Sequence, residues 1–147
     1  MIHRTLAIDD DEVTLILSKY QLKQAAFCEH YVGLLSANAA LEYLKELNSL
    51  QLYHEMPELI IVDINMPVMD AWQFIEAYEK EFGNKFPEIK IVILSSSVDP
   101  QDPIKARKYK SVIEFLSKPL NPAEIENLKY NKWLIKHFVP NFQAQIA

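Results

Sequence analysis

Four polar groups in the sequence have residue types suited to phosphoryl-transfer chemistry, and each follows an apolar run. An acidic run at residues 9–12 follows the first apolar stretch, and Asp63 follows the third. Three serines at 95–97 follow the fourth stretch, and Lys118 follows the fifth. Carboxylates suit Mg²⁺, whereas a lysine and a hydroxyl bind phosphoryl oxygens. Together they predict a carboxylate nucleophile, Asp63, with a cation and a lysine that neutralise charge on the phosphoryl oxygens.

Each group taken alone has a commoner explanation. An aspartate after a strand usually caps a turn or a helix, and acidic residues at a helix start complement its dipole. Lys-Pro pairs and serine runs are common in loops. Their shared placement at the ends of successive apolar runs is what favours a common site.

Five apolar runs of strand length must position these groups. They cover residues 4–8, part of 27–35, 58–62, 89–94 and 111–116. Three are nearly continuous aliphatic runs, which is typical of parallel strands covered on both faces.

Helical patterns separate the runs. The spacing of Val13, Ile16, Leu17 and Tyr20 predicts the first helix. The leucines at 41, 44 and 47, after an Asn38 cap, predict the second helix, and residues 71–82, between Asp70 and Gly83, the third. Residues 102–110, with Pro103 in the first turn, predict the fourth helix, and residues 121–138, from an Asn121 cap, the fifth.

This alternation predicts an α/β fold, a three-layer sandwich of five βα units around a central parallel sheet. Ligands of such sheets bind beyond the carboxyl ends of the strands, where the four polar groups are expected. We expect one domain over residues 1–138, a short tail over 139–147 and no output domain.

Composition narrows the functional classes. No apolar run approaches the roughly 20 residues of a membrane span, the start lacks a secretory pattern, and the lone Cys28 excludes an intrachain disulfide, so we expect a cytoplasmic protein. Residues 1–100 contain 7 Lys and Arg against 16 Asp and Glu, which argues against direct nucleic-acid binding. The four histidines show no metal-like spacing in the sequence, and we treat them as incidental.

Four segments carry a resemblance to a known family. They are "IDDDE" at 8–12, "IIVDINMPVMDAWQF" at 60–74, "IVILSSS" at 91–97 and "EFLSKPL" at 114–120. The chain closely resembles the receiver domain of two-component response regulators over about residues 4–130. The resemblance implies a flavodoxin-like fold with sheet order 2-1-3-4-5, and a signalling protein that catalyses only its own phosphoryl acceptance and autodephosphorylation.

The resemblance also assigns the phosphoacceptor and the cation site. Asp63 occupies the position of the phosphoacceptor, and Asp9 and Asp10 match the acidic pair that holds Mg²⁺. Asn65 stands where the family provides a backbone carbonyl to the metal. Mn²⁺ is an accepted substitute for Mg²⁺ at such sites.

Three further residues match the family's switch positions. Ser95 corresponds to the switch hydroxyl, Lys118 to the lysine that binds the phosphoryl group, and Phe115 to the switch aromatic. We prefer Ser95 to Ser96 because Ser95 directly follows the apolar strand. The Lys118–Pro119 bond is expected to be cis.

The implied partners are a histidine kinase or a histidine phosphotransfer protein as donor, with an unidentified downstream protein or a homodimer as output. We expect the output to use the face of the fourth predicted helix, fifth strand and fifth helix. This face contains basic residues that could bind an acidic partner or simply be solvated: Lys105, Arg107, Lys108, Lys110, Lys129 and Lys132. The aromatic residues of the C-terminal segment either cap the core or form an exposed binding spot: Tyr130, Trp133, Phe138 and Phe142.

Two other functions remain open. A haloacid-dehalogenase-type hydrolase would have a second acid two residues after the nucleophile, where this chain has Asn65. A degenerate receiver that acts only as a binding module would lack one of the acidic, acceptor or lysine positions. Two departures from the family pattern are Ala71 in place of a common glycine and a loop without glycine at 107–112.

Overall fold

The computed structural model describes residues 1–141, in which five strands alternate with five α-helices. All four strand pairings are parallel and the strand order is β2-β1-β3-β4-β5, as predicted. The strands are β1 (Ile2–Ile8), β2 (Cys28–Leu34), β3 (Leu59–Val62), β4 (Lys90–Ser95) and β5 (Val112–Ser117). The helices are α1 (Glu12–Gln24), α2 (Ala37–Ser49), α3 (Ala71–Phe82), α4 (Gln101–Ala106) and α5 (Pro122–Lys129).

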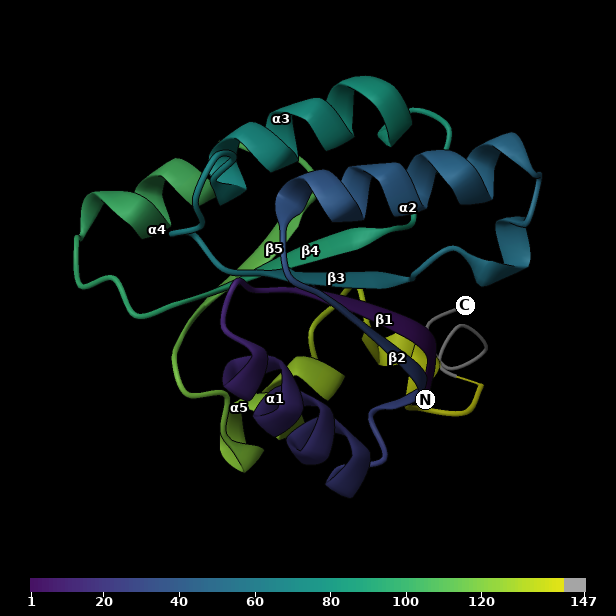
Figure 1. The fold of residues 1–147 in the computed structure, drawn as a ribbon. Helices are drawn as coiled ribbons and strands as arrows, with labels where there is room; N and C mark the ends of the chain where they lie inside the picture. The colour runs from purple at the N-terminus through teal and green to yellow at the C-terminus, as the bar shows by residue number, and fades with distance from the viewer. Residues whose placement is uncertain (142–147) are drawn as a thin grey trace.

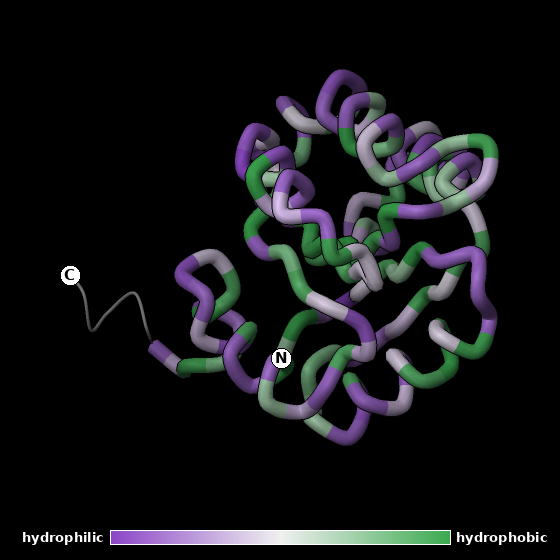
Figure 2. Tube along the Cα trace, turned by 90° about the vertical axis from the view of Figure 1, so that its left-hand side faces the viewer, coloured by the Kyte–Doolittle hydropathy of each residue, from purple (hydrophilic) through white to green (hydrophobic). Residues whose placement is uncertain are grey.

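The sheet lies between two helical layers, with α2, α3 and α4 on one face and α1 and α5 on the other (Figure 1). Each face has its own hydrophobic core, because successive strand residues point to opposite sides. Ile91 and Ile93 of β4 belong to the core under α2 and α3, whereas Val92 and Leu94 belong to the core under α1 and α5. Figure 2 shows hydrophobic residues concentrated in the central strands. Burial on both faces explains the near-continuous aliphatic runs.

Side-chain caps begin most of the helices. Asp70 and Asn121 each form a capping box, with Gln73 and Glu124 respectively, as their positions predicted. The Asn38 cap was wrong: the Ser36 hydroxyl accepts a hydrogen bond from the Ala39 amide at 3.1 Å, so α2 begins earlier. Both serine and asparagine favour such a position, and spacing alone did not separate them.

The first predicted helix is present, but its apolar stripe faces solvent. Val13, Ile16, Leu17 and Tyr20 are each more than half exposed. The face that packs on the sheet instead carries Leu15, Ser18 and Leu22. The sequence of α1 has two apolar faces, and periodicity does not tell which one is covered.

The last two predicted helices are shorter than expected. Helix α5 ends at Lys129, because the Asn131 carboxamide accepts a hydrogen bond from the Trp133 amide at 2.9 Å and starts a turn. A 3₁₀ turn follows at Ile135–His137. Helix α4 ends at Ala106, and Ser111 is then held by Glu79 of α3, whose carboxylate accepts from its amide and its hydroxyl at 2.8 and 2.6 Å.

The C-terminal aromatic residues divide between the two explanations. Phe138 caps the core against Phe27 at 5.1 Å between ring centroids, whereas Tyr130 and Trp133 are exposed. Phe142 and the rest of the proposed tail from 142 onward lie outside the described residues. Within residues 1–141, no helix has the length and apolar character that a membrane crossing needs.

Candidate functional site

Strand pairing brings the two predicted acidic segments together. Ile8 at the end of β1 pairs with Val62 at the end of β3, and the Asp63 amide donates to the Ile8 carbonyl at 3.0 Å. Asp9 and Asp63 therefore leave adjacent central strands side by side. Both are almost fully buried, with 4% and 5% of their surface exposed. Two carboxylates share one largely dry position at the carboxyl edge of the sheet.

Lys118 joins these two carboxylates. Its Nζ atom lies 2.6 Å from Asp9 Oδ2 and 3.3 Å from Asp63 Oδ1. The Lys118 amide also donates to the Ser95 carbonyl at 2.8 Å, which ties the end of β5 to the end of β4. The Lys118–Pro119 peptide bond is cis. One ammonium group thus neutralises part of a paired negative charge.

The pKa values of these groups reflect this crowding. Burial and the charge of Asp9 raise the pKa of Asp63 above the usual carboxyl value, although Lys118 opposes the shift. Burial disfavours the charged form of Lys118, but its hydrogen bond to Asp9 and the charge of Asp63 outweigh this and raise its pKa. The site has more negative than positive charge, so it favours a further cation.

A third carboxylate completes a set that fits a divalent metal. Oxygen atoms of Asp9, Asp10 and Asp63 lie within 4.8 Å of one another, and Asp10 is exposed. An all-oxygen set open to water on one side matches the preference of Mg²⁺, which keeps several water ligands. Asn65 is exposed in the loop after β3. The chemistry of these donors suits Mg²⁺ better than a softer metal.

The three serines have different surroundings. Ser95 is fully buried at the end of β4, and its Oγ atom accepts from the Ser97 amide at 3.0 Å. Ser96 is exposed. The Ser97 hydroxyl donates to Asp102 of α4 at 2.6 Å. Ser95 therefore links the end of β4, through Ser97, to α4.

Phe115 lies on strand β5. It pairs with Ile93 and packs partly buried against the core under α3. A cavity of about 170 Å³ lies beside it, lined by Ala106 at the end of α4, by Arg107 just after it and by β5 residues that include Phe115. The structure therefore brings Asp9, Asp63, Lys118 and Ser95 together, with Phe115 on strand β5 beside β4.

Exposed apolar side chains follow the polar groups of this edge along the chain, and the sequence pattern did not reveal that they are exposed. The α1 stripe begins immediately after the acidic run, and Val68 and Val98 in the loops after β3 and β4 are 91% and 97% exposed. Two apolar faces on one helix were the signal that could have revealed the stripe, because a globular domain covers only one.

The two departures from the family pattern cause little local disturbance. Ala71 is fully buried at the start of α3, so its methyl group has space there. Residues 107–112 form a turn held by the Ser111–Glu79 hydrogen bonds described above. Of the basic residues on the proposed output face, Lys129 is not free, because its Nζ donates to the Ala25 carbonyl and to Glu126, each at 2.7 Å.

Comparisons with known proteins identify relatives over most of the chain. The model of the response regulator receiver domain matches residues 5–128. The two-component response regulator ARR10 of Arabidopsis thaliana is 29% identical over 126 residues, which are 85% of this chain but 20% of that protein. The chain spans about a fifth of the length of the first such relatives.

Solved structures show the same architecture. A two-component response regulator from Cytophaga hutchinsonii is 33% identical, with a TM-score of 0.79 over 92% of this chain and 98% of that one. The Vibrio cholerae chemotaxis protein CheY4 is 22% identical, with a TM-score of 0.68 over 89% and 99% of the two chains. The second likeness supports the fold alone.

Proposed function

The chain belongs to the response regulator receiver domain family, and from this premise we propose that Asp63 is its phosphoacceptor and that phosphorylation switches a partner-binding surface. Receiver domains are signalling proteins of two-component systems rather than ordinary enzymes. The observation that carries the proposal is the contact of Lys118 with both Asp9 and Asp63 at the carboxyl edge of the sheet. Asp9, Asp10 and Lys118 would surround a phosphoryl group on Asp63 with the cation-binding and cationic groups that transfer needs.

In the proposed reaction, an Asp63 oxygen attacks the phosphorus of a phosphohistidine. The new phosphorus–oxygen bond forms as the phosphorus–nitrogen bond breaks, and the departing imidazole keeps the electron pair and takes a proton. Burial leaves Asp63 poorly hydrated, and Lys118 is positioned to exchange a carboxylate contact for a phosphoryl oxygen. In autodephosphorylation, water attacks phosphorus, the bond from phosphorus to the Asp63 oxygen breaks, inorganic phosphate leaves, and the carboxylate is restored.

The cation in this proposal is Mg²⁺, which Asp9, Asp10, Asp63 and the backbone carbonyl of Asn65 would hold. It supplies positive charge that neutralises phosphoryl oxygens. Asp9 also accepts the Asp11 amide at 2.9 Å, which fixes its carboxylate while its second oxygen contacts Lys118. Mn²⁺ would be accepted by the same oxygen ligands.

The proposed switch runs from Ser95 to α4. A phosphoryl group adds negative charge and acceptor oxygens that can recruit the Ser95 hydroxyl. Recruitment would break its contact with Ser97, which is bonded to Asp102 of α4. Phe115 can then move toward the space that Ser95 leaves, and the α4-β5-α5 face changes for a downstream protein or a second copy of the chain.

The donor protein needs its own contact surface, and the exposed α1 stripe offers one that begins just after the acidic pair beside Asp63. A phosphohistidine must come within bonding distance of a buried carboxylate, so the donor has to cover the rim around it. Near that rim, α1 begins at the end of the acidic run and exposes Leu17 and Tyr20, and the loops after β3 and β4 expose Val68 and Val98. We assign this face to a histidine kinase or a histidine phosphotransfer protein.

The two alternative functions are less consistent with these observations. Asn65 stands where a dehalogenase-type hydrolase would need an acid, and it is exposed in its loop. A binding-only module would not need the complete carboxylate and lysine set. We further propose that the protein acts in the cytoplasm.

Phosphorylation by a small donor tests the proposal directly. Incubation with acetyl phosphate and Mg²⁺ should add one acid-stable, base-labile phosphoryl group, detected by intact mass. Asp63→Asn should abolish the adduct, whereas Asp99→Asn, which changes an exposed carboxylate in the loop before α4, should retain it. An adduct that persists in Asp63→Asn would contradict the assignment.

A further inference from the structure

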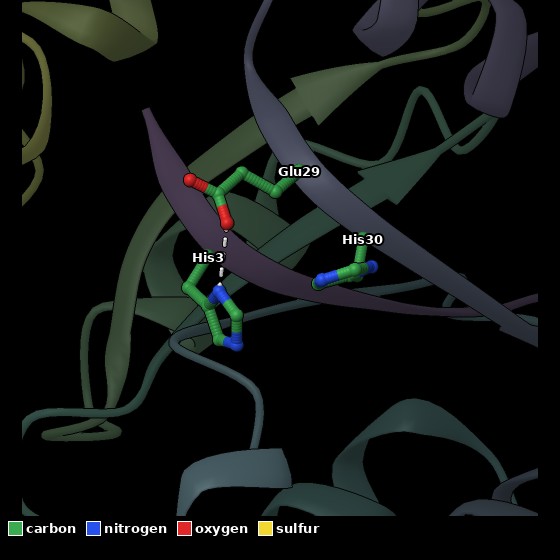
Figure 3. A group of neighbouring side chains, drawn as sticks. All are labelled: His3, Glu29 and His30. Atoms are coloured by element: carbon green, nitrogen blue, oxygen red, sulfur yellow. Dashed lines mark hydrogen bonds and ion pairs between the residues drawn. The ribbon is translucent and has the colours of Figure 1, made fainter.

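Three potential metal ligands meet at the edge of the sheet where β1 and β2 begin, far along both strands from the phosphorylation site. His3 of β1 and Glu29 and His30 of β2 each offer one ligand atom, and these atoms lie within 4.8 Å of one another. Figure 3 shows that the three side chains converge beside the strands. Residues 26 and 27 positions apart in sequence are joined only by the pairing of β1 with β2, so sequence spacing did not reveal them.

Contacts within the cluster and with its surroundings hold His3 in place. His3 Nδ1 lies 2.9 Å from Glu29 Oε2, and the His3 and His30 rings meet edge to face with centroids 5.0 Å apart. The His3 backbone is fixed because its amide donates to Glu58 Oε2 at 2.8 Å. On either side of it, Ile2 pairs with Cys28 and Arg4 with His30.

The ligand types select a metal different from that of the carboxylate site. Imidazole nitrogen suits Zn²⁺ and similar transition metals, whereas Mg²⁺ prefers oxygen ligands alone. Two histidines and one glutamate with an open fourth position form a recurring Zn²⁺ ligand set. Zn²⁺ binds its nitrogen and oxygen ligands at about 2.0–2.2 Å. Glu29 and His30 are exposed, so their side chains can rotate to bring their ligand atoms to that distance.

We propose that His3, Glu29 and His30 form a Zn²⁺-class metal site that clamps edge strand β2 to β1, with water as the fourth ligand. The site is separate from Asp63 and does not depend on phosphorylation. Binding would stabilise the folded chain by mass action, since the unfolded chain does not hold the three ligands together.

Zn²⁺ titration of the tag-free full chain, in the presence of excess Mg²⁺, tests the proposal. The excess Mg²⁺ competes for the carboxylate site but not for histidine ligands. We expect one Zn²⁺ per chain by calorimetry and a rise of the melting temperature with Zn²⁺ concentration. His3→Ala and His30→Ala should each weaken Zn²⁺ binding by at least about 10- to 100-fold. Mutating residues that only hydrogen-bond to a metal ligand already lowers metal affinity by this amount, and losing a ligand should cost no less.

His54→Ala is the matched control, because His54 is an exposed histidine whose side chain is 73% accessible and lies outside the cluster. It should leave Zn²⁺ affinity unchanged. Co²⁺ offers an independent readout, since tetrahedral ligation by this set should give visible absorption bands that Glu29→Gln alters.

Several results would overturn the proposal. They are unchanged Zn²⁺ affinity in both His3→Ala and His30→Ala, loss of binding in Asp10→Asn, and half a Zn²⁺ per chain with metal-dependent dimerisation. Acetyl phosphate incorporation by the His3, Glu29 and His30 variants checks that their fold is intact, because these residues lie outside the carboxylate site.

Discussion

The Asp63 carboxylate lies where burial and a neighbouring carboxylate both oppose its charge. Its raised pKa means that the folded protein holds a proton on Asp63 more tightly than the unfolded chain does. Lys118 offsets part of this unfavourable charge through its contacts with Asp9 and Asp63. Such local instability is common at functional sites, where the charged form is required for chemistry.

The charge of Asp63 should therefore lower the free energy of unfolding at neutral pH. Asp63→Asn keeps the shape without the charge, and we expect it to stabilise the metal-free protein by roughly 0.5–2 kcal/mol at pH 7. The pKa of Asp63 is about 4 in the unfolded chain and higher in the folded protein. The free energy of unfolding of the wild type should therefore fall as the pH rises from about 4 through the folded pKa of Asp63. Urea unfolding at several pH values should show the advantage of the variant growing over this window and then levelling; a constant difference would contradict the pKa assignment.

Tyr78 is a second residue with an unfavourable polar group. It is fully buried, and its hydroxyl has no hydrogen-bond partner among residues 1–141. Tyr78→Phe removes that hydroxyl and should leave stability unchanged or raise it by about 1 kcal/mol. Tyr31→Phe is the matched control, because the Tyr31 hydroxyl donates to the Leu15 carbonyl at 2.9 Å and its loss should cost about 1 kcal/mol. Equal destabilisation of the two variants in urea would argue against an unpaired Tyr78 hydroxyl.

At the level of elements, local rules predicted the strands and several helix starts. The β3 and β4 runs were readable because burial on both faces demands continuous aliphatic residues. Asp70 and Asn121 were readable because capping boxes are local in sequence. The end of α5 could not be predicted in this way. The Asn131 side chain accepts a hydrogen bond from the Trp133 amide and forms a turn in place of further helix, and the spacing of apolar residues carries no sign of that bond. The exposed face of α1 also depended on packing against the whole sheet.

Helix α1 provides a test of the proposed donor surface. Leu17 is 53% exposed, so Leu17→Glu should change stability by less than about 0.5 kcal/mol. The donor for the test is a phosphorylated histidine phosphotransfer domain that phosphorylates the wild-type chain. Leu17→Glu should slow transfer from this donor by about tenfold, which corresponds to a loss of about 1.4 kcal/mol at the interface. Acetyl phosphate incorporation should stay normal, because a small donor needs no docking face.

The matched control for this variant is Leu50→Glu, which changes an equally exposed leucine at the end of α2. It should leave both reactions unchanged. Equal rates of protein-to-protein transfer for the Leu17 and Leu50 variants would remove α1 from the proposed donor surface.

For the whole molecule, the sheet places different functions at its two ends. Asp63 and Lys118 lie at the carboxyl edge, where α1 begins, whereas the proposed histidine site lies where β1 and β2 begin. The residue types of the carboxylate site could be predicted from sequence because each follows its own strand. The histidine cluster could not, because it depends on the lateral pairing of β1 with β2, which brings Glu29 within 2.9 Å of His3.

Coupling between Asp63 and α4 should depend on one hydroxyl. Ser95→Ala should still accept phosphate from acetyl phosphate, because Asp63, Lys118 and the carboxylates remain. Phosphorylated wild-type protein should show altered hydrogen exchange in α4 and β5, over residues 101–117, and the phosphorylated Ser95 variant should lose most of that change.

Ser96→Ala separates this coupling from a general effect of removing a serine, because Ser96 neighbours Ser95 but is exposed. Its phosphorylated form should match the wild type in hydrogen exchange. The proposed path requires the Ser95–Ser97–Asp102 hydrogen bonds, at 3.0 and 2.6 Å, to be the link that phosphorylation breaks. An undiminished exchange response in phosphorylated Ser95→Ala would show that α4 senses Asp63 by another route.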